Sequence, residues 1–343
     1  MPALPGTLTL LNCANNRITS LPALPSALNT LDCSGNKLTA LPNLSAVLRY
    51  LFCYSNSLTS LPSLPATLER LDCSLNQLTT LPSLPNSLLR VLCSYNQLTI
   101  LPVLPNALQT LYCDNNSITL LPAFPNTLIF LECSRNNLIS LPSLPTSLNI
   151  LSCSYNQLTS LPNLPTQLGL MFCNHNQLVS LPTLPNNLNV LVCDGNILNS
   201  LPGLPASLIT LFCTQNLLTA LPALPASLRQ LACDYNKLNV LPALPGTLID
   251  LECSNNFLTY LPTLPDSIDG LDCTSNLISC FPSFPEKTGG TTGFIMLNNN
   301  PCGCLPNYVP AMDSATLAIP LCGVGNILSN PGDCQFAQGT VGY

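Results

Sequence analysis

The sequence predicts a solenoid: a stack of short turns sharing one parallel β-sheet, with no regular helix in the connecting segments. Three observations predict this fold. A 20-residue period stays in phase from Met1 to Cys280 and gives fourteen units. Within each unit, inward and outward positions alternate over four residues, which is the periodicity of a strand. Two prolines recur in almost every unit, and proline disfavours a helix in the rest of the turn.

The predicted strand occupies positions 10 to 13 of each unit, so the first covers residues 10–13. Positions 11 and 13 point inward, and positions 10 and 12 point outward. Because the strand returns every twenty residues, neighbouring strands run parallel and in register, at a spacing of about 4.8 Å. Leucine dominates positions 1, 4, 8, 11 and 18, and we expect these side chains to fill a layered interior.

The rest of each unit is a return segment marked by Pro at positions 2 and 5, with Ser45 as the exception at the second position. Proline removes a backbone donor and favours an extended conformation in the residue before it. We therefore expect a polyproline-like convex side without helices.

An asparagine stands at position 16 of every unit, from Asn16 to Asn276. A buried polar group has to be hydrogen-bonded. Stacked amides that bond the backbone of adjacent turns would meet this requirement, so the sequence predicts an asparagine ladder where the chain leaves the strand.

Fourteen of the nineteen cysteines form a column at position 13, from Cys13 to Cys273. Zinc ligands come in close clusters such as C-x2-C, whereas these cysteines recur once in twenty residues. Neighbouring α-carbons fall within disulfide range, but side chains on parallel strands in register keep their Cβ atoms too far apart for a bridge. We expect buried, unreactive thiols and neither a metal nor a cofactor.

The consensus L-P-x-L-P-x-x-L-x-x-L-x-C-x-x-N-x-L-T-x resembles the leucine-rich repeats. Its L-x-x-L-x-C-x-x-N-x-L part resembles the conserved segment of that family, and L-P-x-L-P-x-x resembles the short, 20-residue bacterial class. That class includes effectors of Gram-negative pathogens and surface proteins of Bacteroidetes-type bacteria, and the cysteines fit the second group better. The resemblance covers residues 1 to about 312. It implies a leucine-rich-repeat solenoid, conventionally α/β but here almost all β, with a concave parallel sheet.

The repeat changes at the C-terminal end, where the fifteenth unit, 281–304, is four residues longer. Cys280 and Cys304 share position 20 of successive turns, and we predict a disulfide between them. Cys322 and Cys334 flank a Gly/Asn/Pro-rich loop and form the second predicted pair, whereas Cys302 takes an inward leucine slot and is expected to remain a thiol. The expected domains are a solenoid over 1–304, a disulfide-containing cap over 305–334, and the start of a further module or linker over 335–343.

Composition and motifs exclude several functions. The net charge is −6 with nine Lys and Arg, so the basic footprint that nucleic-acid binding needs is missing. No apolar run reaches the ~18 residues of a membrane span. The single histidine, His175, lies near Cys173, but Cys173 points inward, and no catalytic motif occurs. We expect a protein that is not an enzyme. Cap disulfides favour an extracellular or cell-surface location, although the sequence contains no signal peptide.

Variable outward positions on the strands are the candidate binding surface, because the invariant positions serve the fold. In the middle of the solenoid these positions are apolar and aromatic, which is typical of surfaces that anchor a partner. The C-terminal flank is acidic, with Asp250, Glu252 and Asp272. We expect the partner, a protein or a polysaccharide, to contact Leu92, Tyr112, Phe130, Ile150, Leu170, Phe172, Val190, Val192 and Phe212.

Other interpretations of the same surface stay open. Strand propensity alone favours Phe, Val and Tyr, and self-association would also cover an apolar face. The solenoid could serve as a structural cell-surface spacer or a self-assembling surface element. A third hypothesis is ice binding through threonine, which occupies position 19 in nine of the fourteen units, although Ile139 and Val179 interrupt this row.

Overall fold

The computed structural model describes residues 2–285, 293–312 and 314–322. Each repeat contributes one three-residue strand, and no α-helix occurs in these ranges; a single 3-10 helix, η1 (Thr316–Ala318), comes after the last strand. The strands are β1 (Leu10–Asn12), β2 (Thr30–Asp32), β3 (Tyr50–Phe52), β4 (Arg70–Asp72), β5 (Arg90–Leu92), β6 (Thr110–Tyr112), β7 (Phe130–Glu132), β8 (Ile150–Ser152), β9 (Leu170–Phe172), β10 (Val190–Val192), β11 (Thr210–Phe212), β12 (Gln230–Ala232), β13 (Asp250–Glu252), β14 (Gly270–Asp272) and β15 (Phe294–Met296).

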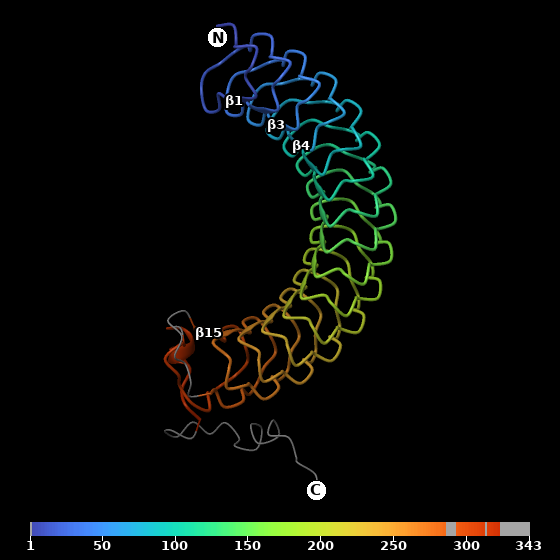
Figure 1. Ribbon diagram of the computed structural model, residues 1–343. Coiled ribbons are helices and arrows are strands. Elements are labelled where there is room, and N and C mark those ends of the chain that lie inside the picture. The colour runs from blue at the N-terminus through green and yellow to red at the C-terminus, as the bar shows by residue number, and fades with distance from the viewer. Residues whose placement is uncertain (1, 286–292, 313, 323–343) are drawn as a thin grey trace. The chain divides into compact units, whose positions relative to one another are not determined.

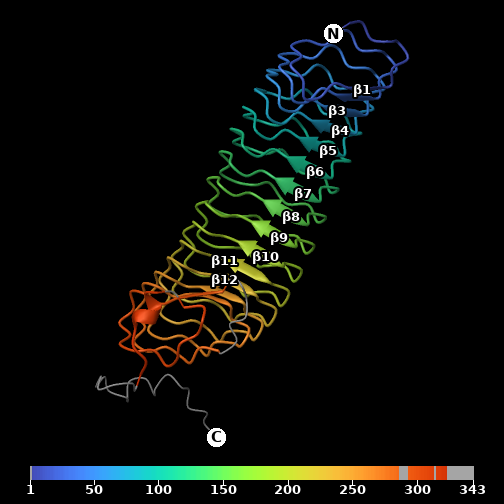
Figure 2. The same ribbon diagram turned by 90° about the vertical axis from the view of Figure 1, so that its left-hand side faces the viewer.

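The chain is a parallel β-solenoid and divides into two compact units, Met1–Asn176 and Gln177–Tyr343. The first unit contains β1 to β9 and the second β10 to β15. Within each unit, successive strands pair in parallel with a twenty-residue register, as in Leu31↔Leu51. The pairing of β14 with β15 spans the longer repeat and joins Leu271 to Ile295. Figures 1 and 2 show the strands of each unit in a row along one side of the stacked turns; we call the side formed by positions 10 and 12 the inner face.

The interior of each turn is filled as the repeat pattern predicts. From the second turn onward, the residues at positions 8, 11 and 18 are buried, as Leu148, Leu151 and Leu158 illustrate at 0% exposure. The position-13 cysteines are buried beside them, and no disulfide joins any of the fourteen. Position 4 differs from the expectation, because its leucine is only half-buried in most turns and lies at the edge of the interior.

The return segments contain one tight turn in each repeat. Its carbonyl acceptor is the second proline: in a representative turn, the Leu148 N–H donates to the Pro145 oxygen at 3.1 Å. Ser45 keeps the same bond to Leu48 without a proline. Its hydroxyl also donates to the carbonyl oxygen of Ser26 in the preceding turn at 2.7 Å. The expectation of helix-free returns is confirmed over the described repeats.

The predicted asparagine ladder is confirmed. The Asn156 Nδ2 donates to the carbonyl oxygens of Cys153 in its own turn and of Cys133 in the preceding turn, both at 3.1 Å. The Asn156 Oδ1 accepts a hydrogen bond from the Leu138 N–H at 3.0 Å. The amide of Asn156 therefore links two successive turns. Asn156 is buried, with only 8% of its surface exposed.

Position 15 adopts a left-handed backbone conformation that the sequence analysis did not predict. From Asn15 to Asn299, the left-handed residues at this position have φ between 51° and 62°. Only Gly35 and Gly195 among them are glycines. This bend turns the chain out of the strand. It allows the amide of the next residue, the position-16 asparagine, to reach the carbonyl oxygens of the position-13 cysteines.

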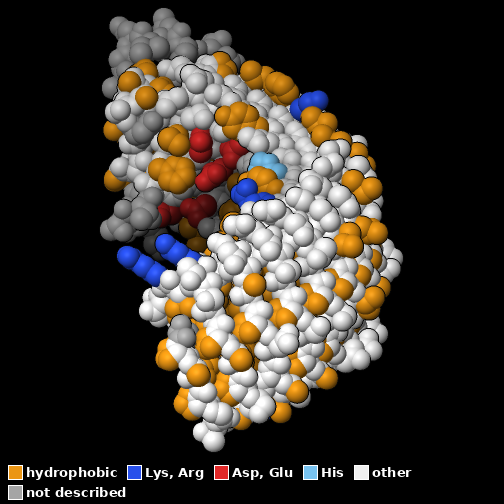
Figure 3. Space-filling model, turned by 90° about the horizontal axis from the view of Figure 1, so that it is seen from above, with side chains coloured by type: hydrophobic (Ala, Val, Ile, Leu, Met, Phe, Trp, Pro, Cys, Tyr) orange, Lys and Arg blue, Asp and Glu red, His pale blue; other side chains and the backbone are white. Residues whose placement is uncertain are grey.

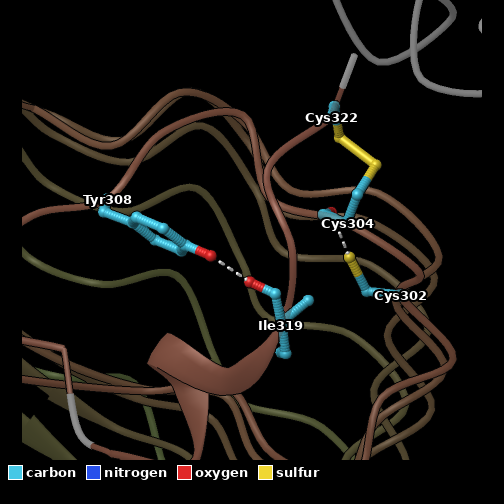
Figure 4. Close-up of a disulfide and its surroundings, with 5 residues drawn as sticks. All are labelled: Cys302, Cys304, Tyr308, Ile319 and Cys322. Carbon is cyan, nitrogen blue, oxygen red and sulfur yellow. Dashed lines mark hydrogen bonds between the residues drawn. A yellow bond between two sulfur atoms is a disulfide. The ribbon is translucent and has the colours of Figure 1, made fainter. Parts of the chain in front are cut away.

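The C-terminal disulfide pairing differs from the prediction. Cys304 is bonded to Cys322, with 5.0 Å between their α-carbons, so the predicted pairs Cys280–Cys304 and Cys322–Cys334 are both wrong (Figure 4). The reason is a further partial turn after residue 304. Its parallel bridge between Leu305 and Leu321 brings Cys322 beside Cys304.

The other cap cysteines complete this correction. Cys280 is disulfide-bonded, though not to Cys304, and Cys334 lies outside the described residues. Cys302 remains a thiol as predicted, and its Sγ donates to the Cys304 carbonyl oxygen at 2.7 Å. In the same region, the Tyr308 hydroxyl donates to the Ile319 carbonyl oxygen (Figure 4).

Candidate binding surface

An apolar row runs along position 10 on the inner face of the first unit. Phe130, Ile150 and Leu170 are direct register neighbours on β7, β8 and β9. All three are half-buried. The Phe130 ring stacks on Tyr112 of β6, with 4.6 Å between ring centroids. Tyr112, Phe130, Ile150 and Leu170 therefore form a continuous apolar surface.

Position 12 of the same unit is mixed. Leu92 and Tyr112 are register neighbours on β5 and β6. Glu132 and Ser152 come next on the following two strands and separate Tyr112 from Phe172. Six of the nine predicted contact residues lie in this unit, and Phe172 shares the strand β9 with Leu170 of the apolar row.

The remaining three predicted residues lie in the second unit. Val190 and Val192 are on β10, and Val192 is the register neighbour of Phe212 on β11. They are half-buried like their counterparts in the first unit. A hollow of about 280 Å³ lies beside Phe212, with Leu231 and Ala232 among its lining residues. The other residues that line it are Gln230, Asp250, Glu252 and Phe294.

Gly270 lies next to two of the residues that line this hollow, and a side chain at Gly270 would collide with both of them. An ideal Cβ at Gly270 would lie 2.7 Å from the Asp250 Oδ1 and 3.1 Å from the Phe294 ring. Glycine in a strand often marks such a close approach. Because Gly270 has no side chain, the Asp250 carboxylate and the Phe294 ring can both lie close to its backbone.

The predicted acidic flank of the second unit brings several carboxyl groups close enough to repel one another. The pKa of Glu252 is raised because burial disfavours its charged form, and because Asp234, Asp272, Asp250 and Asp194 repel it. The pKa of Asp234 is raised by burial as well. Acidic side chains gather on the inner side, whereas much of the visible remainder carries apolar or uncharged polar groups (Figure 3). This part of the face attracts basic groups.

A polar hollow of about 350 Å³ occupies the first unit beside the apolar row. Ser134 and Ser152 share a hydrogen bond of 2.8 Å within it, and Ser154 donates to the Asn174 Oδ1. The hollow is lined by Tyr95, Asp114, Asn115, Glu132, Ser134, Arg135, Ser152, Ser154, Tyr155, Phe172 and Asn174.

A three-membered stack of side chains at position 15 borders this hollow. The Arg135 guanidinium lies 4.3 Å from the centroid of the Tyr155 ring, whose centroid is 4.3 Å from that of His175. The sequence signal of this stack is that its three residues hold position 15 in three successive turns.

Few of the described residues are candidates for a catalytic nucleophile or a metal ligand. Cys173 is buried within the thiol column, and His175 is held in the ring stack. Burial raises the pKa of the Cys153 thiol to about 12, so the thiolate is scarce at neutral pH. Residues 2–285, 293–312 and 314–322 contain no group of three or more His, Cys, Asp or Glu placed to hold a metal ion, and no helix there is long and apolar enough to cross a membrane.

Comparisons with known proteins place this geometry in a family. A family model for leucine rich repeats (2 copies) matches residues 7–46, and no match was found among curated proteins. The solved structure of YopM from Yersinia enterocolitica WA-314 is 36% identical, covers 91% of this chain and 69% of its own, and superposes with a TM-score of 0.88. The chain belongs to the leucine-rich-repeat family.

Two further solved structures extend this likeness. YopM from Yersinia pestis, described as a leucine-rich effector protein, is 34% identical over 89% of both chains, with a TM-score of 0.78. The functional domain of InlJ from Listeria monocytogenes, described as including a cysteine ladder, is 25% identical over 80% of this chain and 69% of its own, with a TM-score of 0.63. Repeat solenoids of this kind present extended surfaces for binding other macromolecules.

Proposed function

We propose that this leucine-rich-repeat protein is a non-catalytic binding or adhesion scaffold that recognises a macromolecular partner through its inner face. The observation that carries the proposal is the half-buried row Phe130–Ile150–Leu170, continued by Tyr112. Contiguous exposed apolar surface of this kind commonly marks an interaction site. Aromatic side chains at the centre of such a surface contribute most of the binding energy.

The anchors we assign are Phe130, Phe172 and Phe212. Each projects from a strand at a variable position, so none is required by the repeat itself. Rings that are already half-buried lose little conformational freedom when a partner covers them. A protein partner is favoured over a polysaccharide, because the row is apolar rather than hydrogen-bonding.

The cell surface or the extracellular space is the location that we propose for this function. Disulfides persist in oxidising compartments, and both Cys280 and Cys304 are disulfide-bonded. The column thiols are compatible with such a compartment because burial keeps oxidants away from them.

The test compares the protein with a variant in which Phe130, Phe172 and Phe212 are all replaced by serine. Binding is measured on protein and glycan arrays, and self-association by sedimentation velocity, well below the unfolding temperature. We expect the variant to lose the wild-type interaction by at least tenfold, because each anchor typically contributes above ~1 kcal/mol.

A matched control replaces three exposed apolar residues outside the strands, Ile139, Val179 and Leu217, by serine. This control is expected to bind like the wild type. Equal binding by the Phe→Ser variant would remove the anchor assignment. A wild-type protein that neither binds nor self-associates would favour the spacer function instead.

A further inference from the structure

Two arginines stand side by side on the inner face of the first unit. Arg70 of β4 and Arg90 of β5 are direct register partners at position 10. Arg90 is exposed and Arg70 half-buried. Adjacent strands lie about 4.8 Å apart, and like charges directly opposite each other destabilise a sheet. Within the described part of the chain, no other basic residue occupies an outward strand position.

No carboxylate of the described residues forms a salt bridge with either arginine. The salt bridge found there joins Arg49 to Glu69, and the second oxygen of Glu69 accepts from the Tyr50 hydroxyl at 3.2 Å. Asp72, two residues beyond Arg70, accepts from the Ser74 N–H at 3.2 Å. Burial raises the pKa of Asp72, and the charge of Arg70 partly opposes this rise. No salt bridge of the described residues pairs a carboxylate with either guanidinium, so the pair keeps its positive charge.

Arg70 is held in place with one donor unused. Its guanidinium carbon lies 5.0 Å from the centroid of the Phe52 ring, which fixes the side chain by a cation–π contact. Its Nε is buried and has no hydrogen-bond partner among the described residues. A buried donor without an acceptor is rare in folded proteins, and an external acceptor is one explanation of it.

A hollow of about 220 Å³ lies beside the pair. It is lined by Tyr50, Glu69, Arg70, Leu89 and Arg90. This volume admits one small charged group with a short apolar stem. Leu89 and Tyr50 supply the apolar wall, and the two arginines supply donors for oxygen atoms.

We propose that Arg70 and Arg90 form a binding site for a carboxylate carried by an acidic segment of a protein partner. Guanidinium groups bind paired oxygens through two parallel hydrogen bonds. A carboxylate placed between the two would offset their mutual repulsion. Glu69 lines the same hollow, so a singly charged carboxylate fits better than a doubly charged phosphate.

This site lies on the inner face and rests on the proposed function, but it uses none of the three phenylalanine anchors. The two ideas are therefore separable. The Phe130/Phe172/Phe212→Ser variant is expected to bind an acidic probe as the wild type does. Loss of probe binding in that variant would contradict the independent site.

The experiment follows the arginine Nε–Hε signals of the 15N-labelled full chain by NMR at low ionic strength. The probe is an acetylated, amidated tetraglutamate peptide, with tetraglutamine as its uncharged match and inorganic phosphate as the second anion. We expect a saturable shift of the Arg70 signal with tetraglutamate alone. The affinity of every variant is taken from the backbone amide signals of the same titration, and we expect it to be at least tenfold weaker in Arg70→Gln/Arg90→Gln.

Two variants sharpen the result. Arg229→Gln removes an exposed arginine of the second unit and is expected to bind tetraglutamate normally. Arg70→Lys/Arg90→Lys keeps the charge without the planar fork and is expected to bind more weakly than the wild type. Absence of a saturable shift, or unchanged affinity in Arg70→Gln/Arg90→Gln, overturns the site. Phosphate binding as tight as tetraglutamate overturns the choice of a carboxylate.

Discussion

The amide of each position-16 asparagine performs a task that no apolar residue of similar size can take over. The carbonyl oxygens of Cys133 and Cys153 both accept from the Asn156 amide, and the Leu138 N–H donates to it. All of these backbone groups are near the buried interior and away from water. A side chain lacking the amide would leave them without partners. The regular recurrence of asparagine therefore reflects the backbone geometry of every turn.

Replacing Asn156 with leucine should lower the free energy of unfolding by about 3 kcal/mol, because each buried polar group left unpaired costs about 1–3 kcal/mol. Urea denaturation followed by circular dichroism measures the change. Gln157→Leu at the exposed neighbouring position serves as the control and should stay within about 0.5 kcal/mol of the wild type. A loss below about 1 kcal/mol for Asn156→Leu would show that the ladder bonds are dispensable.

At the scale of one element, the strand and the bend that ends it differed in how well the sequence predicted them. The strand at position 10 onward was predictable, because its period, its inward apolar residues and its cysteine repeat in phase. The left-handed bend at position 15 was not, because that position holds residues as different as Leu75, Tyr95, Arg135 and His175. Six of the fifteen residues at this position are asparagine or glycine, which favour this conformation. The other nine are of mixed types, so residue type alone did not single the bend out.

The bend predicts a stabilising substitution. Leu75 has a φ of 55° and is 50% exposed; a left-handed conformation costs an ordinary residue about 1–2 kcal/mol, whereas asparagine tolerates it better. Leu75→Asn should therefore raise the free energy of unfolding by about 0.5–1 kcal/mol, measured by urea denaturation.

The complementary change, Gly35→Ala, should destabilise the protein. Its new Cβ would lie 2.5 Å from the Asn15 Oδ1 at a φ of 62°. A stability gain in Gly35→Ala, or a loss in Leu75→Asn, would contradict the account of the bend.

At the scale of the whole molecule, the sequence predicted the regular repeats well and the C-terminal cap poorly. The stacked turns, the thiol column and the apolar row on the strands all arise from residues that recur in phase. The Cys304–Cys322 bond could not be predicted, because it depends on a partial turn whose length no repeat defines. The sequence alone shows that Arg70 and Arg90 hold position 10 in two successive repeats. The unpaired donor of Arg70 and the hollow beside the pair required coordinates.

The buried thiol column makes the free energy of unfolding of the protein depend on pH. Desolvation by burial raises the pKa of Cys33 and of Cys153 to about 12, from an ordinary value of 9.0, and it raises the pKa of other column thiols in the same direction, as for Cys253. In the unfolded chain these thiols ionise near pH 9, while in the folded protein they stay protonated. The unfolded state therefore binds fewer protons above pH 9, and stability falls as pH rises from 9 towards 12.

The expected slope is steep because the effect repeats along the chain. Each buried thiol costs about 1.4 kcal/mol of stability for every pH unit above its unfolded pKa. Summed over the column thiols whose pKa is raised, the loss becomes comparable to the ~5–15 kcal/mol that stabilises most folded domains, so we expect the protein to unfold at a pH of about 10. Urea denaturation from about pH 7 to about pH 10 under argon measures the slope. In Cys113→Ala/Cys133→Ala/Cys153→Ala, stability at neutral pH should fall because of the cavities. The alkaline slope should become shallower by the share of three thiols, because burial raises the pKa of each of them. An unchanged slope in that variant would mean that groups other than the column govern alkaline unfolding.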